Sequence, residues 1–216
     1  MTPSVQMAHI GLCNPKNPEN VGSVMRAAGC YGADEVRFTG RRYLLAAKHR
    51  KNGASNTDTK PRITSNIPLV QVENMLEKLS PDTKIVCFEL VVGAKPLPEF
   101  RHPDKALYIF GPEDGQIPQS IVDQAHYVLY VPTATCMNLA ASVNVVLYDR
   151  LAKGFTAQKE SLVVDQNEWI RKTRDNNNRL RVKTKEELQQ QKRQHQKNNT
   201  EPEKILLSSE KKQRNH

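Results

Sequence analysis

The sequence lacks the cysteine patterns that stabilise small secreted domains or bind structural metals. Its four cysteines are 17, 57 and 49 positions apart, and they form no Cys-x-x-Cys pair and no Cys–His cluster with zinc spacing. We therefore expect no disulfide framework and no metal site. A reducing cytoplasm is the natural compartment for such cysteines.

Long apolar runs are also absent. No stretch approaches the roughly 18 apolar residues that a membrane span needs, and the N-terminus has no apolar signal-peptide segment. We expect a soluble, cytoplasmic protein with no membrane partner. Only 38% of the 216 residues are hydrophobic and the mean hydropathy is -0.64, which indicates that part of the chain is not packed.

Positive charge is concentrated in the last third of the chain. Residues 1–150 contain 16 Lys and Arg against 14 Asp and Glu, whereas residues 151–216 contain 16 against 9. A basic, polar tail on a nearly neutral body suggests a polyanionic partner, with nucleic acid first. A solvated tail without a partner is the alternative.

Short apolar runs rich in β-branched and aromatic residues alternate with helical patterns. The predicted strands cover 8–13, 35–39, 84–92, 106–110 and 127–131; the predicted helices cover 21–30, 69–79, 118–125 and 138–153. This alternation predicts an α/β fold with a mostly parallel sheet and helices on both faces. Residues 40–66 are polar and basic, and we interpret them as a long, partly mobile insertion.

The composition also predicts the domain organisation. Residues 1–155 are expected to form the folded domain, and 156–171 a partly packed segment. Residues 172–216 are charged and rich in Gln and Asn. Because they bury too little apolar surface to offset their ordering entropy, we expect a basic, disordered or solvated-helical extension.

A first candidate site follows the first predicted strand. Asn20 is placed as a helix N-cap, Gly22 allows another backbone to approach closely, and Arg26 lies one turn beyond Gly22. An ordinary capped helix with a surface arginine is the alternative. Apolar residues surround Arg26, which favours a largely buried helix in which a guanidinium must meet a partner.

A second candidate site, 109–118, follows a predicted buried strand. Gly111 and Gly115 flank Glu113 in a sharp turn, and ligands of open α/β sheets bind where such loops leave the strands. A simple turn is the alternative. The chain has no Gly-x-Gly-x-x-Gly and no P-loop pattern, which argues against a dinucleotide- or nucleotide-dependent enzyme.

A third candidate site begins an apolar helix at 137–151. Met137 and Asn138 start this helix, and Ser142 and Asn144 are polar positions within it. A core helix with an ordinary cap accounts for most of this segment. Only Asn138, Ser142 and the preceding loop are candidates for chemistry.

In this order the three motifs resemble those of the SpoU (TrmH-type) family of the SPOUT class of RNA methyltransferases. The family pattern N-x-G-x-x-x-R is matched by Asn20, Gly22 and Arg26. The pattern F-G-x-E-x-x-G-x-P is matched by Phe110, Gly111, Glu113 and Pro118, with Gly115 one place early. The pattern N-L-x-x-S is matched by Asn138, Leu139 and Ser142. The resemblance covers roughly residues 8–153. No segment resembles the N-terminal RNA-binding domain usual in the family.

The resemblance implies a C-terminal deep trefoil knot that forms a pocket for S-adenosylmethionine. It also implies a homodimer with motifs of both chains near each site. The implied cofactor-binding residues are Glu89, Leu90, Gly111, Val131, Cys136, Met137 and Leu139.

The implied reaction is methyl transfer to a ribose 2′-hydroxyl of tRNA or rRNA, without a metal. The family assigns proton removal to the arginine matched by Arg26. Because arginine normally stays protonated, we expect Arg26 to orient the hydroxyl and a neighbouring phosphate, and to act as a base only if strongly perturbed. Glu113 and Asn138 would shape the site, and Asn20 would fix the helix of Arg26 or contact RNA.

Lys and Arg side chains are expected to bind the RNA phosphates. The candidates are Arg41, Arg42, Arg50 and Lys51 in the insertion, together with the tail after Arg171. A non-catalytic RNA-binding protein that keeps the SPOUT fold is the alternative function, and methylation of a base is a less favoured variant of the reaction.

Overall fold

A computed structural model describes residues 7–49, 66–157, 166–173 and 180–196. By its internal contacts the chain divides into two compact units, Met1–Leu162 and Val163–His216. The first unit contains the sheet and its covering helices. The division lies a few residues beyond the boundary at 155 that composition predicts.

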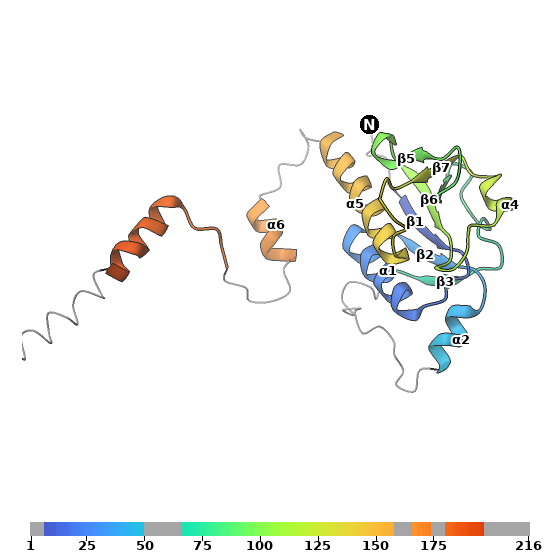
Figure 1. Ribbon diagram of the computed structural model, residues 1–216, viewed down its shortest axis with the longest axis horizontal. Coiled ribbons are helices and arrows are strands. Elements are labelled where there is room, and N and C mark those ends of the chain that lie inside the picture. The colour runs from blue at the N-terminus through green and yellow to red at the C-terminus, as the bar shows by residue number, and fades with distance from the viewer. Residues whose placement is uncertain (1–6, 50–65, 158–165, 174–179, 197–216) are drawn as a thin grey trace, which may run out of the picture. The chain divides into compact units, whose positions relative to one another are not determined.

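The first unit is built on one seven-stranded sheet in which every pairing is parallel (Figure 1). Its strands are β1 (Met7–Leu12), β2 (Glu35–Phe38), β3 (Leu69–Gln71), β4 (Lys84–Phe88), β5 (Lys95–Pro96), β6 (Lys105–Phe110) and β7 (Tyr127–Tyr130). The strand order is β3-β2-β1-β6-β4-β7-β5. This confirms the expected parallel α/β fold, and the trefoil knot stays a prediction.

Strand β6 is buried on both faces of the sheet. Every residue of β6 after Lys105 is buried, as expected for a parallel strand covered on both faces. Tyr108 and Phe110 contribute to one apolar cluster, whereas Leu107 and Ile109 contribute to the other. Two cores therefore lie on opposite sides of the sheet.

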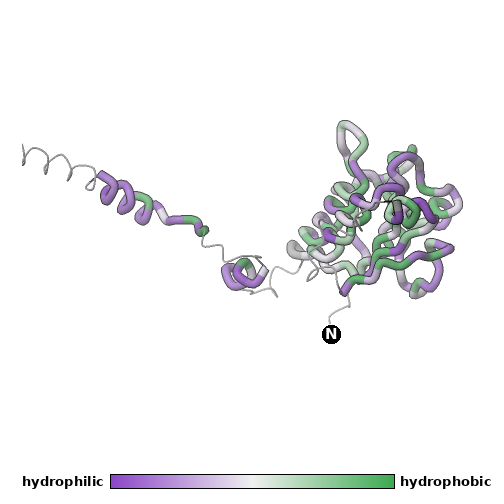
Figure 2. The backbone as a smooth tube through the Cα atoms, turned by 90° about the horizontal axis from the view of Figure 1, so that it is seen from below, coloured by the Kyte–Doolittle hydropathy of each residue, from purple (hydrophilic) through white to green (hydrophobic). Residues whose placement is uncertain are grey.

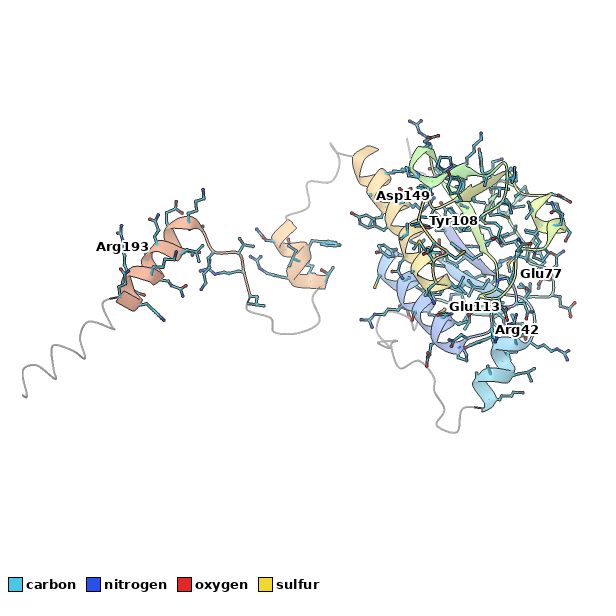
Figure 3. All side chains as sticks on the ribbon, in the orientation of Figure 1. Arg42, Glu77, Tyr108, Glu113, Asp149 and Arg193 are labelled. Atoms are coloured by element: carbon cyan, nitrogen blue, oxygen red, sulfur yellow. The ribbon has the colours of Figure 1, made fainter. Side chains whose placement is uncertain are left out.

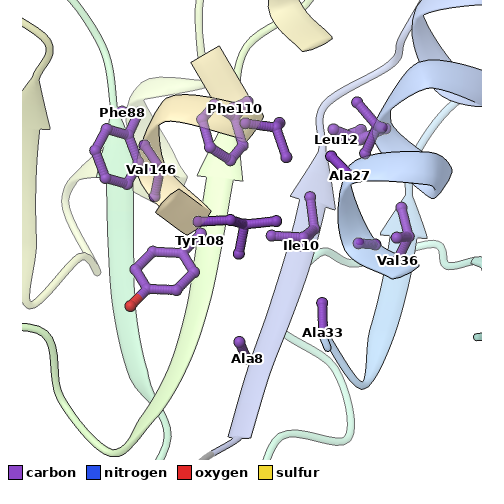
Figure 4. Close-up of a cluster of buried hydrophobic side chains, with 14 of the residues drawn as sticks. Ala8, Ile10, Leu12, Ala27, Ala33, Val36, Phe88, Tyr108, Phe110 and Val146 are labelled. Carbon is purple, nitrogen blue, oxygen red and sulfur yellow. The ribbon is translucent and has the colours of Figure 1, made fainter. Parts of the chain in front are cut away.

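Helices α1 (Pro18–Tyr31) and α5 (Leu139–Ala157) lie side by side on one face (Figure 1). Figure 4 shows the core that they close over the strands, with Ala27 near Leu12 and Val146 near the two phenylalanines. The rings of Phe88 and Phe110 stack with centroids 5.2 Å apart. This packing fixes the start of each helix beside the carboxyl ends of the central strands.

Mostly irregular chain covers the opposite face. Turns after β3 bury Met75, and the single helical turn α4 (Gln119–Val122) lies where a helix over 118–125 is predicted. A Cβ atom on Gly11 would lie 2.7 Å from the Met75 sulfur. Glycine at this strand position therefore allows Met75 to pack closely on the sheet.

The predicted helix over 69–79 is wrong, because β3 is followed by turns. The buried guanidinium of Arg37 accounts for this difference. Its Nη1 donates to the carbonyl oxygens of Met75 and Glu77, at 3.3 and 2.9 Å. The side chain of Asn74 also accepts from the Leu76 amide. Both interactions compete with helical backbone bonding.

Other element boundaries differ from those predicted. Helix α1 starts at Pro18, and its N-cap is Asn17, whose side chain accepts from the Glu19 amide at 2.9 Å. The expected N-cap role of Asn20 is therefore wrong. Strand β4 stops at Phe88, four residues before the predicted end. Strand β5 and the 3-10 helix η1 (Leu97–Glu99) follow it and were not predicted.

The insertion predicted at 40–66 begins with a helix, α2 (Arg42–His49). Residues 50–65, which include Arg50 and Lys51, lie outside the described part of the chain. The start of the insertion is therefore regular structure attached to the sheet.

The second unit contains α6 (Gln166–Thr173) and a helix over residues 185–196. Trp169 and Ile170 of α6 are 54% and 52% exposed. Thr184 and Glu187 form a capping box at the start of the second helix, which is mainly hydrophilic along its length (Figure 2). Its side chains are exposed except for Glu187.

Candidate active site

A pocket of about 200 Å³ lies at the carboxyl edge of the sheet, where β4, β6 and β7 end and α5 begins. All seven predicted cofactor-binding residues line it: Glu89, Leu90, Gly111, Val131, Cys136, Met137 and Leu139. Glu113 lines it as well. Sequence reasoning did not assign the lining residues Tyr130, Thr133 and Pro112.

Glu89 joins two of the pocket loops, and Gly111 leaves room for this contact. The Glu89 carboxylate accepts a hydrogen bond from the Ile117 amide at 3.0 Å. A Cβ atom on Gly111 would lie 3.0 Å from Glu89 Oε2 and 3.2 Å from the Ile117 nitrogen. The glycine therefore leaves room for the hydrogen bond that closes this wall of the pocket.

Glu113 connects the second motif to the first. Its carboxylate accepts from the backbone amides of Lys16 and Asn17, at 2.8 and 3.1 Å, and from the side-chain amide of Asn20 at 2.8 Å. Burial acts to raise the pKa of Glu113, but these hydrogen bonds outweigh it and hold the pKa below its usual value. Glu113 is therefore placed to stay ionised at the rim of the pocket.

Asn20 then connects Glu113 to the third motif. Asn138 Nδ2 donates to Asn20 Oδ1 at 3.0 Å. Since a carboxylate only accepts, the Asn20 nitrogen must face Glu113 and its oxygen must face Asn138. Asn138 Oδ1 also accepts from the Ala140 amide at 2.9 Å, which caps the start of α5. Three motifs far apart in sequence thus meet in one chain of hydrogen bonds.

Arg26 lies elsewhere. The side of α1 that faces the core carries Val21, Val24 and Ala28, and Arg26 is on the exposed side. Six residues of helix place it about 240° around the axis from Asn20. The apolar residues around Arg26 are buried, as expected, whereas Arg26 itself is exposed and does not line the pocket of its own chain. Gly22 is buried in the core.

Asp114, next to Glu113, pairs with two positively charged side chains. Arg42 Nη2 donates to both of its oxygens at 2.7 Å, and Lys16 Nζ donates to one at 3.3 Å. The Arg42 hydrogen bond, and then that of Lys16, lower the pKa of Asp114. Arg42 thus has an internal partner, whereas Arg41 is exposed.

Over residues 7–49, 66–157, 166–173 and 180–196, no group of three or more His, Cys, Asp or Glu side chains is arranged to hold a metal ion. Within the same ranges no helix has the length and apolar character to cross a membrane.

Solved structures share this fold. A protein described in terms of the 2-OH methylation of C/U34 on tRNA has a TM-score of 0.57 at 21% identity, over 68% of this chain and 91% of that chain. The A. aeolicus TrmH/SpoU tRNA modifying enzyme has a TM-score of 0.53 at 16% identity, over 77% of this chain and 87% of its own.

A third structure carries a cofactor. The SpoU methyltransferase AviRb from Streptomyces viridochromogenes, solved in complex with AdoMet, has a TM-score of 0.54 at 16% identity. The alignment covers 72% of this chain and 62% of AviRb, so the chain spans less than two thirds of that protein's length. At these identities the likeness establishes the fold.

Sequence comparison establishes the family. No curated protein matches the chain. The family model described as SpoU rRNA Methylase matches residues 7–148, a range that includes all three motifs and every strand of the sheet. The chain therefore belongs to the SpoU rRNA Methylase family, a family of RNA methyltransferases.

Proposed function

We propose that the chain transfers a methyl group from S-adenosylmethionine to a ribose 2′-hydroxyl of tRNA or rRNA in the cytoplasm. The observation that carries this proposal is the convergence of the three motifs at one pocket, through the Glu113–Asn20–Asn138 hydrogen bonds. The similar structures with bound AdoMet and the one described for 2-OH methylation support the cofactor and the target atom.

The pocket residues fit this cofactor chemically. Leu90, Val131 and Leu139 offer apolar surface for an adenine ring. The carboxylates of Glu89 and Glu113 give the pocket negative charge, which would suit the positively charged sulfonium and ammonium groups of the cofactor. The trefoil knot, which the family resemblance implies, would hold the loops of the pocket together.

S-adenosylmethionine would supply a methyl group that its positively charged sulfur already activates. The protein would then supply position, because holding the two reactants in line removes much of the barrier. Glu113, Asn20 and Asn138 would keep the pocket rim and the start of α1 in fixed register. Arg26 would orient the 2′-hydroxyl and the adjacent phosphate through its planar guanidinium.

We also propose that Arg26 acts in the pocket of a second copy within a homodimer. Arg26 is exposed and does not line the pocket of its own chain. A dimer that packs α1 beside the partner's pocket would place the Arg26 guanidinium at that pocket.

Subunit complementation tests this arrangement. Arg26→Ala and Cys136→Trp would each inactivate a homodimer, one through the arginine and the other because a large ring at this exposed lining position fills the pocket. A purified heterodimer of the two variants keeps one complete site only if arginine and pocket come from different chains. About half of wild-type activity is then expected, whereas a site within one chain predicts none.

Calorimetry separates the enzyme from a binding module. The wild-type chain is expected to bind S-adenosylmethionine, and Cys136→Trp, at an exposed lining position, is expected to abolish this binding while the fold survives, as judged by circular dichroism. A wild-type chain that binds RNA but not the cofactor would favour a non-catalytic RNA-binding protein with the same fold.

A further inference from the structure

Asp114 joins three segments that lie far apart in sequence. It belongs to the loop after β6, yet it accepts hydrogen bonds from Lys16, before α1, and from Arg42, at the start of α2. Figure 3 shows Arg42 and the neighbouring Glu113 at the same edge of the unit. The loop that lines the pocket is therefore tied directly to α2.

The turn that leads into α2 is held from the other side as well. Gly40 has a φ of +77°, and its carbonyl accepts from Gln71 Nε2 at 2.8 Å. The amide of Asn14 donates to Thr39 Oγ1 at 3.2 Å. The position of the first turn of α2 is thus fixed by the ends of β1, β2 and β3, together with Asp114.

Apolar contacts attach the first turn of α2 to the sheet, and we infer that polar contacts orient the rest of the helix. The Tyr43 ring meets the Phe38 ring edge-on, with centroids 5.2 Å apart, and Leu44 packs against the same core. Leu45, the next residue, is 54% exposed. The Arg42–Asp114 pair is therefore placed to set the angle of the helix.

Residues 41–51 carry only positive charge. This segment contains Arg41, Arg42, Lys48, Arg50 and Lys51 and no acidic residue. Phosphate binding depends on such cations at fixed positions. Arg41 and Lys48 are exposed, and a helix whose start is joined to the pocket loop can hold these two in register with the reacting ribose.

We propose that Asp114 is a positioning residue that, through Arg42, orients α2, with Arg41 before it and Lys48 on it, as the RNA-binding arm of the site. The inference rests on the proposed RNA methyltransferase function and deepens it. It also reassigns Arg42, which we predicted to bind a phosphate, to an internal contact. Exposed ion pairs contribute little to global stability, so the role concerns orientation and not folding.

The test compares Asp114→Asn with Asp82→Asn. Asp82 forms a similar exposed pair with Lys105 at 2.6 Å, and it does not line the pocket. Both substitutions remove one negative charge and so raise the net charge by one, which by itself should strengthen RNA binding. The proposal predicts the opposite for Asp114→Asn alone: a KM for RNA raised about fivefold, with the KM for S-adenosylmethionine within about twofold of wild type.

Arg42 variants identify the kind of contact. Arg42→Ala should weaken RNA binding at least as much as Asp114→Asn, since it also removes a positive charge. The double variant should lose little more than Arg42→Ala, because both changes remove one interaction. The charge-exchanged Arg42→Asp/Asp114→Arg chain should recover most of the RNA affinity. If Arg42 bound a phosphate directly, the exchanged chain would bind RNA more weakly than Arg42→Ala.

Hydrogen exchange in the free protein gives a readout that does not depend on activity. The amides of α2 should exchange faster in Asp114→Asn and Arg42→Ala than in Asp82→Asn. Unchanged exchange in α2, or RNA binding in Asp114→Asn as tight as in Asp82→Asn, would overturn the proposal. A wild-type chain that neither binds nor methylates RNA would instead refute the proposed function, while the exchange data would still decide whether Asp114 orients α2.

Discussion

The Glu113 carboxylate accepts a hydrogen bond from the Asn20 side chain at 2.8 Å, although 93 residues separate the two in the sequence. Asn138 continues this chain of contacts from the start of α5 at 3.0 Å. The first, second and third motifs each supply one member. A change in any one should therefore alter the position of the other two.

Substitutions at Asn138 can separate helix capping from site geometry. Asn138→Asp keeps an acceptor for the Ala140 amide, so the thermal midpoint should stay close to wild type. It replaces the donor to Asn20 with a carboxylate, and turnover should fall about 10- to 100-fold. Asn138→Ala should lose the same activity and, in addition, about 1 kcal/mol of stability. Wild-type turnover in Asn138→Asp would show that the Asn20 contact is dispensable.

Gly111→Ala should weaken cofactor binding. The added methyl group would lie 3.0 Å from Glu89 Oε2 and 3.2 Å from the Ile117 nitrogen, so the loop must shift. Overpacking of this kind costs about 1–3 kcal/mol. Isothermal titration calorimetry with S-adenosylmethionine should show the higher Kd.

Gly154→Ala is the matched control for Gly111→Ala. It lies within α5, and a Cβ atom there would meet nothing within 4 Å. This change should stabilise the helix by about 0.5–1 kcal/mol and leave the Kd unaltered. Equal Kd values for the two variants would contradict the assigned packing around Gly111.

Acid should remove the contribution of Glu113 to stability. Its pKa in the folded chain lies below the usual 4.5, so the unfolded chain binds more protons between the two values. The contribution is complete above pH 4.5 and is lost as the pH falls through the folded-state pKa. In urea titrations, the difference between wild type and Glu113→Gln should therefore shrink below that pH. The exposed Glu73→Gln is the control, and a difference that stays constant with pH would contradict the assignment.

How far the sequence predicts the fold depends on how much apolar surface each element carries. Strand β6 and helix α5 were predicted because their apolar runs are long and continuous. The helical spacing of Val72, Met75 and Leu79 favours a helix in the stretch after β3. The long-range contacts of Arg37 decide its backbone instead, and periodicity cannot show them.

The candidate site could be predicted only in part. The lining of the pocket follows from the family resemblance, whereas the Asn20–Glu113 contact depends on the relative positions of distant loops. Asn17 does carry a local signal for the start of α1, because an N-cap residue followed by proline marks a helix start. The exposure of Arg26 depends on which side of α1 faces the sheet.

Tyr108→Phe should destabilise the fold without touching the pocket. The buried Tyr108 hydroxyl is 2.7 Å from His102 Nδ1 and accepts from Arg150 at 2.8 Å. Removing it leaves buried polar groups with fewer partners, at a cost of about 1–3 kcal/mol in urea denaturation. Tyr127→Phe, at a ring that is 41% exposed, should cost less than about 0.5 kcal/mol. Equal effects of the two changes would show that the hydroxyl network adds nothing.

The most direct test of the proposed reaction is to identify the methylated nucleoside. Purified protein is incubated with methyl-labelled S-adenosylmethionine and total RNA, and the digested RNA is resolved by mass spectrometry. The account predicts label in a 2′-O-methylated nucleoside with wild type, and none with Arg26→Ala although that variant still binds the cofactor. Label found only on a base, or full transfer by Arg26→Ala, would contradict it.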